Sequence, residues 1–430
     1  MSATVEEAAL RPVRGAQPWR MLGALVLGFA AGLAAVFLDD GIREFALRTA
    51  AIVGGLWLNA LKMTVIPLIV ALLILGIAQG AEAARAGGLA ARAMAWFVAI
   101  YFCSAAFGAL TINGLLGAFP LPDPALQALR SGLAAIGPTA TASVAPPVSN
   151  FFGSIIPANA IASAAEGNVL QLVVFTFLFA LAASRIPARS RDSLLSFFEA
   201  VRDALLVLIG WVLWIAPIGV FALAFALATG AGGAAVAALA HYIVLLCTIG
   251  ALVGLSGYAL AMFAGRRPLP AFAKAMLLPQ SVAVSTRSSL ASIPAMFVAA
   301  RRLGVQEKVA DVTFPMIGAL FRPTGPAMNV AVAFYVAHWL GLEPSAVQIA
   351  AAVAVATVIS FGSISVPGEA SFITSIAPVA MALGVPIAPL ALLVAVEMVP
   401  DIFRTVGNVT IDVAVTTAVD QKEAGEALKS

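Results

Sequence analysis

The stretch 397–412 reads EMVPDIFRTVGNVTID and places charged residues in an otherwise apolar part of the 430-residue chain. Each residue of an α-helix turns the chain by about 100°, so polar residues spaced three or four apart share a face. Five side chains of this stretch fall on one narrow face: Glu397, Asp401, Arg404, Asn408 and Asp412. Such a face must meet partners, water or a ligand, because burying an unpaired charge is costly.

The rest of the chain is too apolar for a typical soluble protein. Hydrophobic residues make up 62% of it and charged residues only 10%, whereas about a quarter of the residues of a soluble domain are charged. Apolar runs close to the length that spans a bilayer, about 20 residues as a helix, occur without a formal charge at 21–38, 93–122, 167–184, 204–265, 323–342 and 370–396. The chain is therefore predicted to be an all-α polytopic membrane protein. On lipid, the four charges of 397–412 would cost on the order of 10 kcal/mol.

The basic residues between the apolar runs set the expected topology. Every second loop is rich in them: Arg85 and Arg92, then Arg185, Arg189 and Arg191, then Arg266, Arg267 and Lys274. The positive-inside rule places these loops in the cytoplasm, together with the tails 1–17 and 419–430. Spanning helices are expected near 18–38, 49–80, 91–118, 151–184, 199–228, 236–264, 308–340 and 386–418. The expected location is the inner (plasma) membrane of the cell.

Two further apolar segments, 268–300 and 347–384, are rich in Ser, Gly and Pro at their centres. The loop charges require each segment to enter and leave on one side of the membrane, so both are predicted to be re-entrant hairpins. Irregular backbone at membrane depth is tolerated only where protein buries it or a wet cavity adjoins it. Each hairpin precedes a helix, with opposite orientations, and such inverted repeats hold a binding site where they meet. The predicted fold has eight transmembrane helices and two re-entrant hairpins; the alternative is ordinary helices broken by Pro and Gly.

The charges of 397–412 also predict the class of ligand. Three carboxylates share the face with one guanidinium, so the surplus needs other cations: Arg287, Arg322, metal ions or protons. The fork of Arg404 can hold a carboxylate through two hydrogen bonds, and Asp401, one turn away, can take an ammonium group. This combination fits aspartate or glutamate. The sequence offers no nucleophile–base pair or metal cluster that would indicate an enzyme, and its basic residues do not indicate a nucleic-acid partner.

Several motifs carry a resemblance to a known family. They are D-x-x-R-T-x-x-N-V-x-x-D at 401–412, TRSS at 286–289 before Pro294, SFGSISVPG at 360–368, and PAN at 157–159 followed by GNVLQ at 167–171. In these motifs the chain resembles the dicarboxylate/amino acid:cation symporter family over about residues 18–418. The resemblance implies a glutamate-transporter-like fold and a secondary active transporter of the elevator type, working as a homotrimer in the lipid bilayer.

The same resemblance implies a division into two units. Residues 18–80 and 151–228 would form a scaffold with the trimer contacts. The moving transport domain, with both hairpins, would comprise 91–118, 236–300, 308–340 and 347–418. No cofactor is implied apart from a coupling ion, Na⁺ or H⁺.

Position by position, the resemblance implies a substrate site. Its residues would be Arg287, Ser288, Ser289, Val366, Pro367, Gly368, Asp401, Arg404, Thr405 and Asn408. Arg404 would hold the side-chain carboxylate and Asp401 the amino group, with Arg287 beside Asp401 when the site is empty. Because both Asp401 and Arg404 are present, an acidic amino acid is favoured. A C4-dicarboxylate symporter, and an uncoupled transporter or anion channel on the same scaffold, remain alternatives.

The chain departs from the family at its seventh-helix motif, N-M-D-G-T, which reads RPTGP at 322–326. Thr324 replaces an aspartate and Arg322 an asparagine. The residues implied in cation or proton coupling are Gly318, Arg322, Thr324, Ser360, Ser363, Glu369, Glu397, Asn408 and Asp412, with Gly318, Asn408 and Asp412 as a remaining sodium site.

A guanidinium is always charged, so Arg322 is expected to neutralise Glu397 or Asp412 without a sodium ion. Glu369 and Glu397 are then candidates for protonation, and fewer sodium ions per cycle are expected. The alternative is that Arg322 points into a solvated crevice and sodium still binds.

Overall fold

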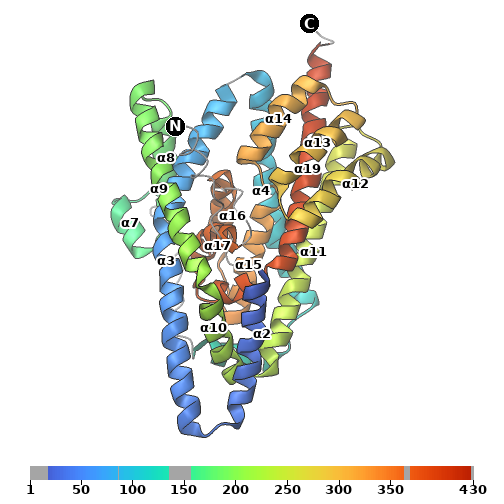
Figure 1. Cartoon of the computed structure of the whole chain (residues 1–430). Helices are drawn as coiled ribbons and strands as arrows, with labels where there is room; N and C mark the ends of the chain where they lie inside the picture. Colours follow the sequence, from blue (N-terminus) through green and yellow to red (C-terminus); the bar gives the residue numbers. More distant parts are fainter. Residues whose placement is uncertain (1–17, 86, 135–155, 363–368, 428–430) are drawn as a thin grey trace, which may run out of the picture.

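Helices make up every regular element in residues 18–85, 87–134, 156–362 and 369–427, which this computed structural model describes (Figure 1). Backbone polar groups inside a bilayer must be paired within the segment, which favours helices. The first half contains α2 (Pro18–Ala34), η1 (Ala35–Phe37), α3 (Asp40–Arg85), α4 (Gly88–Ala118), α5 (Asp123–Ala134), α7 (Ala160–Glu166), α8 (Val169–Ala183), α9 (Ala188–Trp214) and α10 (Ala216–Ala231). The second half contains α11 (Gly233–Phe263), α12 (Leu269–Thr286), α13 (Ser289–Arg302), α14 (Glu307–Leu320), α15 (Gly325–Leu340), α16 (Ala346–Ile359), η2 (Ser360–Gly362), α17 (Glu369–Ala382), α18 (Leu390–Leu393), η3 (Val394–Val396) and α19 (Met398–Ala427).

The described residues include five helices long and apolar enough to cross a membrane, and a sixth span if α9 and α10, bent by 54°, count as one. The other two expected spans, 151–184 and 308–340, are broken. Gly167, in the left-handed conformation at φ +74°, separates α7 from α8. Residues 321–324 separate α14 from α15, where Pro323 disfavours a helical conformation for the residue before it. The all-helical membrane fold is confirmed, while the count of eight stays a prediction.

Several helix boundaries differ from the expected ones. The helix expected at 49–80 starts earlier, at Asp40, and continues to Arg85. The last helix, expected at 386–418, starts later, at Met398 after the short α18 and η3, and continues to Ala427. Helix α5 was not expected at all. It packs against α10, α11 and α15, and its Arg130 donates a hydrogen bond to the Trp339 carbonyl (3.2 Å).

The helices form two packed groups. Helices α2, α3, α8, α9 and α10 contact one another, and α11 to α15, α4 and α19 form the other group. Figure 1 shows α3, α8 and α9 on one side and α11, α12, α13 and α19 on the other. Helices α12 and α13 pack together as one hairpin and α16 and α17 as the other; the second also contacts α3, α4 and α15.

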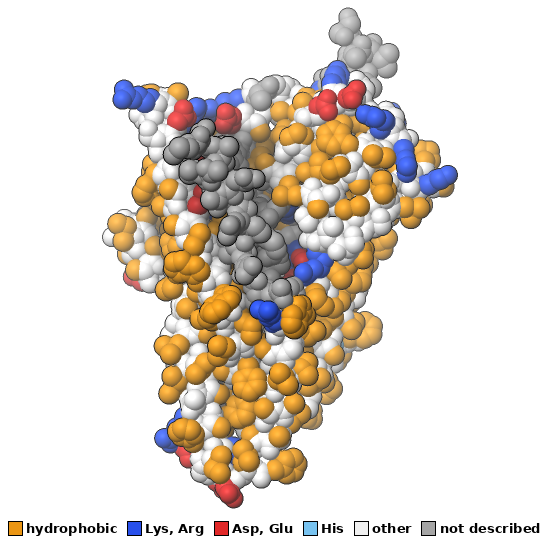
Figure 2. Space-filling view, in the orientation of Figure 1, with side chains coloured by type: hydrophobic (Ala, Val, Ile, Leu, Met, Phe, Trp, Pro, Cys, Tyr) orange, Lys and Arg blue, Asp and Glu red, His pale blue; other side chains and the backbone are white. Residues whose placement is uncertain are grey.

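Glycines bring several helices close together. A Cβ at Gly28 would lie 2.6 Å from the carbonyl oxygen of Phe221, and one at Gly32 would lie 2.5 Å from that of Phe225. The backbones of α2 and α10 are therefore in direct contact. Small residues at such contacts are typical of membrane helices, because lipid provides no hydrophobic drive that would hold helices together. Figure 2 shows the corresponding exterior: hydrophobic side chains cover much of the middle of the molecule, and most charged ones lie near its two ends, with a few at mid-height.

Candidate substrate site

The tip of the first hairpin is a short irregular link between two helices. Arg287 adopts the left-handed conformation (φ +51°) at the end of α12. Ser288 then caps α13, because its Oγ accepts a hydrogen bond from the Ala291 backbone N–H (3.2 Å). This local geometry turns the chain and leaves the Arg287 side chain beside α19.

The tip of the second hairpin lies outside the described residues. Ser363, Val366, Pro367 and Gly368, all expected at the site, belong to this stretch, and the side chain of Glu369 is likewise not described. Ser360 is described and buried, and its hydroxyl donates to the carbonyl of Ala356 (2.7 Å) in the last turn of α16.

Arg404 lies at the centre of a buried polar cluster. It donates from Nη2 to Oε1 of Glu397 (2.9 Å) and from Nη1 to Oδ1 of Asn329 (3.0 Å). Tyr242 donates to the other oxygen of Glu397 (3.1 Å). The Glu397 side chain is 5% exposed and that of Arg404 16%, so their attraction is screened much less than that of a surface pair. Glu397, directly before α19, is therefore paired with Arg404 of that helix and does not need Arg322.

Sequence reasoning missed two members of this cluster, Asn329 on α15 and Tyr242 on α11. Both are buried polar residues in helices that are otherwise apolar. A polar side chain in such a helix needs a partner, and this signal was available in the sequence. The identity of each partner could not be read from the sequence. Asn329 lies 75 residues from Arg404 along the chain, and Tyr242 lies 155 residues from Glu397.

Asp401 faces the tip of the first hairpin. Its Oδ2 lies 3.7 Å from Nη1 of Arg287, and the two side chains are 14% and 27% exposed. The distance is that of a loose ion pair and is too long for a hydrogen bond. Asp401 thus lies one turn from Arg404 on the same helix, with opposite charge. The hydroxyl of Thr405, also expected at the site, donates to the Asp401 carbonyl (2.8 Å).

Asn408 holds the break between α14 and α15 against α19. Its Oδ1 accepts hydrogen bonds from the backbone N–H of Thr324 (2.9 Å) and from the Thr324 hydroxyl (2.6 Å). The same hydroxyl lies 2.9 Å from the Arg404 carbonyl. Thr324 thus links the α14–α15 break to α19.

Arg322 turns back onto the end of α14. Its Nη1 donates to the carbonyls of Ile317 (2.9 Å) and Phe321 (2.7 Å), and its Nη2 donates to that of Gly318 (2.9 Å). These bonds direct the guanidinium of Arg322 to the end of α14. They also exclude Glu397 as its partner in this conformation. The last carbonyls of a helix lack partners within it and carry partial negative charge, so a guanidinium is well placed there.

Asp412 lies deeper along α19. Its side chain is fully buried, and neither carboxylate oxygen receives a hydrogen bond from the described residues. Within the described part of the chain, no group of three or more His, Cys, Asp or Glu residues could hold a metal ion.

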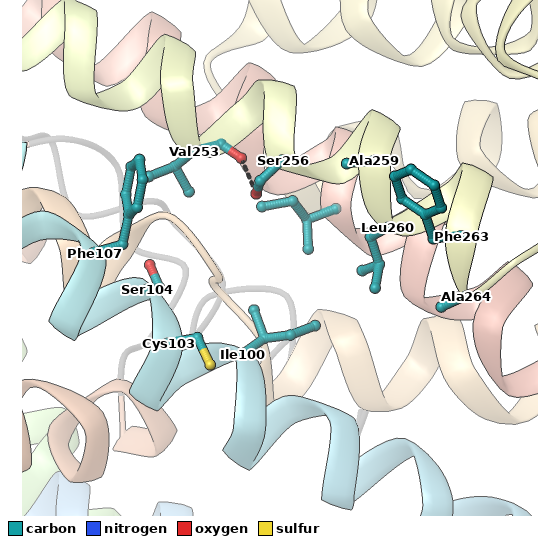
Figure 3. Close-up of a pocket in the computed structure, with 11 residues that line it drawn as sticks. Ile100, Cys103, Ser104, Phe107, Val253, Ser256, Ala259, Leu260, Phe263 and Ala264 are labelled. Atoms are coloured by element: carbon teal, nitrogen blue, oxygen red, sulfur yellow. Dashed lines mark hydrogen bonds between the residues drawn. The ribbon is translucent and has the colours of Figure 1, made fainter.

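A separate cavity of about 400 Å³ lies between α4 and α11, with Ile411 of α19 at its side (Figure 3). Its lining is almost entirely apolar. The hydroxyls at its wall are already used: Ser104 donates to the Pro323 carbonyl (2.6 Å) and Ser256 to the Val253 carbonyl (2.6 Å). The cavity therefore does not suit an acidic substrate, and the polar cluster on α19 is the candidate substrate site.

Comparison with known proteins agrees with this geometry. The model of the sodium:dicarboxylate symporter family matches residues 18–422. The chain belongs to this family. Sodium:dicarboxylate symporters are transporters and not enzymes, and the chain is accordingly a cation-coupled membrane transporter.

Individual relatives in the family differ in their named substrates. The chain is 25% identical to the proton/glutamate-aspartate symporter of Escherichia coli (strain K12), over 93% of this chain and 91% of the relative. It is 29% identical to the proton/sodium-glutamate symport protein of Bacillus subtilis (strain 168), over 83% and 82%. It is 27% identical to the C4-dicarboxylate transport protein of Laribacter hongkongensis (strain HLHK9), over 86% and 83%. Membership of the sodium:dicarboxylate symporter family therefore leaves the substrate open.

Proposed function

We propose that this transporter carries a small acidic amino acid such as aspartate or glutamate, together with a cation. The observation that supports this most directly is the placement of Arg404 and Asp401 one turn apart on α19, beside the tip of the first hairpin. A guanidinium and a carboxylate at this spacing complement the side-chain carboxylate and the ammonium group of an acidic amino acid.

Binding then requires a local exchange of partners. The ammonium group of the substrate takes the place of the loosely held Arg287 at Asp401. Arg404 has five N–H donors, so it can bind the substrate carboxylate while it keeps its bonds to Glu397 and Asn329. Glu397 and Asn329 fix the direction of the guanidinium and so define where the carboxylate binds.

A charge count supports coupling to a cation. Three carboxylates (Glu397, Asp401, Asp412) and three guanidiniums (Arg287, Arg322, Arg404) surround the candidate site, so their formal charges cancel. An acidic amino acid adds one net negative charge. Moving it through the hydrocarbon region is costly unless a cation accompanies it. Sodium, a proton or both would serve.

A C4-dicarboxylate is the second candidate. One observation favours it: Asp401 already has a cationic neighbour in Arg287, so its role could be structural instead of binding an ammonium group. The two candidates predict different effects of Asp401 substitution on the binding of aspartate and succinate.

The same proposal covers the assembly. We place the transporter in the inner membrane as a homotrimer with both termini in the cytoplasm. The division of the helices into two packed groups supports a scaffold of 18–80 and 151–228 and a moving transport domain.

Uptake into proteoliposomes tests the function. Labelled aspartate, glutamate, succinate and alanine are offered with an inward sodium gradient, an inward proton gradient, or neither. We expect accumulation of aspartate or glutamate above equilibrium with at least one gradient. Preference for succinate would overturn the choice of substrate, and flux that never exceeds equilibrium would instead indicate an uncoupled transporter or channel.

A further inference from the structure

At the break between α14 and α15, backbone carbonyl oxygens surround the guanidinium group of Arg322. Three backbone carbonyls at the end of α14, those of Ile317, Gly318 and Phe321, accept hydrogen bonds from the guanidinium of Arg322 at 2.7–2.9 Å. The backbone N–H of Arg322 is also fixed, because it donates to the hydroxyl of Tyr101 (2.8 Å). The residue is thus held at both its backbone and its side chain.

Asp412 is the charged residue of the sodium site that the resemblance implies. Its carboxylate is completely buried and receives no hydrogen bond from the described residues. An uncompensated charge in this environment is strongly destabilising.

The residues present do not fit a sodium ion at Gly318, Asn408 and Asp412, the site implied by the resemblance. Hard cations bind through several oxygen ligands at once. The Gly318 carbonyl is already bound to Arg322, together with the carbonyls of Ile317 and Phe321. A cation that entered would also meet the fixed positive charge of Arg322.

We propose that the guanidinium of Arg322 is a tethered cation that takes the place of a dissociable sodium ion at the α14–α15 break. This inference deepens the proposed function, on which it rests for its role in coupling. Because a guanidinium is effectively always charged, this position is neutralised throughout the transport cycle. The transporter then gains no driving force from sodium at Asp412.

Thermal unfolding of the purified, substrate-free protein tests this, with sodium chloride exchanged for choline chloride at constant ionic strength. Arg322→Asn removes the charge and opens the carbonyls, so sodium should now stabilise the protein. At a sodium concentration about 100 times the dissociation constant, binding should raise the melting temperature by several degrees. Arg322→Asn/Asp412→Asn should lose this response, and Arg322→Lys, which keeps the charge, should not gain it. Arg301→Asn, at an exposed arginine of α13, is the matched control.

A second comparison does not depend on the folding of Arg322→Asn. If sodium raises the melting temperature of the wild-type protein by binding at another site, it should raise that of Asp412→Asn by the same amount. The inference is overturned if Asp412→Asn abolishes a wild-type sodium response, or if folded Arg322→Asn shows no response to sodium. Aspartate is absent from these measurements, so failure here is distinguishable from failure of the proposed substrate.

Discussion

Arg404 combines two tasks at the level of single residues: it neutralises the buried Glu397 and presents its remaining N–H groups to a ligand. Truncating one partner of a buried, hydrogen-bonded charge pair costs about 2–5 kcal/mol. Arg404→Ala should therefore weaken aspartate binding by at least about 30-fold, while the protein still elutes as a folded oligomer. Calorimetric titration with aspartate measures the loss, and Arg302→Ala on the exposed end of α13 serves as control. Unchanged aspartate affinity in Arg404→Ala would remove Arg404 from the substrate site.

Asp401 decides between an amino acid and a plain dicarboxylate. A hydrogen bond to a charged group contributes about 1.5–3 kcal/mol. Asp401→Ser should therefore lower affinity for aspartate roughly 10-fold or more, while affinity for succinate falls much less. Competition of each ligand against labelled substrate measures the ratio. Asp311→Ser, at an exposed carboxylate on α14, is the matched control. Equal losses for both ligands would make Asp401 a structural partner of Arg287 and favour the dicarboxylate reading.

The sequence predicts these residues better than it predicts their partners. Helical spacing alone places Glu397, Asp401 and Arg404 on one face, because positions on a single helix follow from its period. The direction of Arg322 does not follow from any period. It depends on where α14 ends, since the carbonyls that bind its guanidinium are free only at a helix end.

At the scale of the helices, the spacing of apolar residues does not predict where two helix backbones come into direct contact. A Cβ at Gly108 of α4 would lie 2.4 Å from the carbonyl oxygen of Ala327 on α15, whereas a Cβ at Gly114, on the same helix, would meet nothing within 4 Å. Overpacking at such a contact costs about 1–3 kcal/mol. Gly108→Ala should therefore lower the melting temperature in detergent, and Gly114→Ala should leave it unchanged or slightly raise it. Equal melting temperatures for the two variants would contradict the α4–α15 contact.

The length and hydropathy of a segment decide which helices can be predicted from the sequence. Long apolar runs predicted α2, α4 and α11 because length and hydropathy suffice for a span. Helix α5 was missed because it is short and amphipathic and lies outside any such run. The interruption of 308–340 was missed because Gly and Pro also occur within continuous membrane helices, where neighbouring groups compensate for lost bonds.

At the scale of the whole molecule, the buried charged residues determine which cation can drive substrate transport. With Arg322 fixed at the α14–α15 break, the cation that accompanies the substrate must bind elsewhere. Glu397 is the carboxylate that joins α19 to α11, through Arg404 on one side and Tyr242 on the other. It lies beside the residue proposed to bind substrate, so a proton carried on Glu397 would be coupled to substrate binding through their shared partner, Arg404.

We therefore expect an inward proton gradient to drive aspartate accumulation in proteoliposomes from which sodium has been replaced by choline. Glu397→Gln keeps the size of the side chain and can still hydrogen-bond to Arg404 and Tyr242, but it cannot release or take up a proton. This variant should lose accumulation driven by the proton gradient and keep exchange of internal for external aspartate, which needs no net proton movement. Labelled uptake at a clamped membrane potential measures both. A strict requirement for sodium in the wild-type protein, or proton-driven accumulation by Glu397→Gln, would show that the coupling proton is not carried by Glu397.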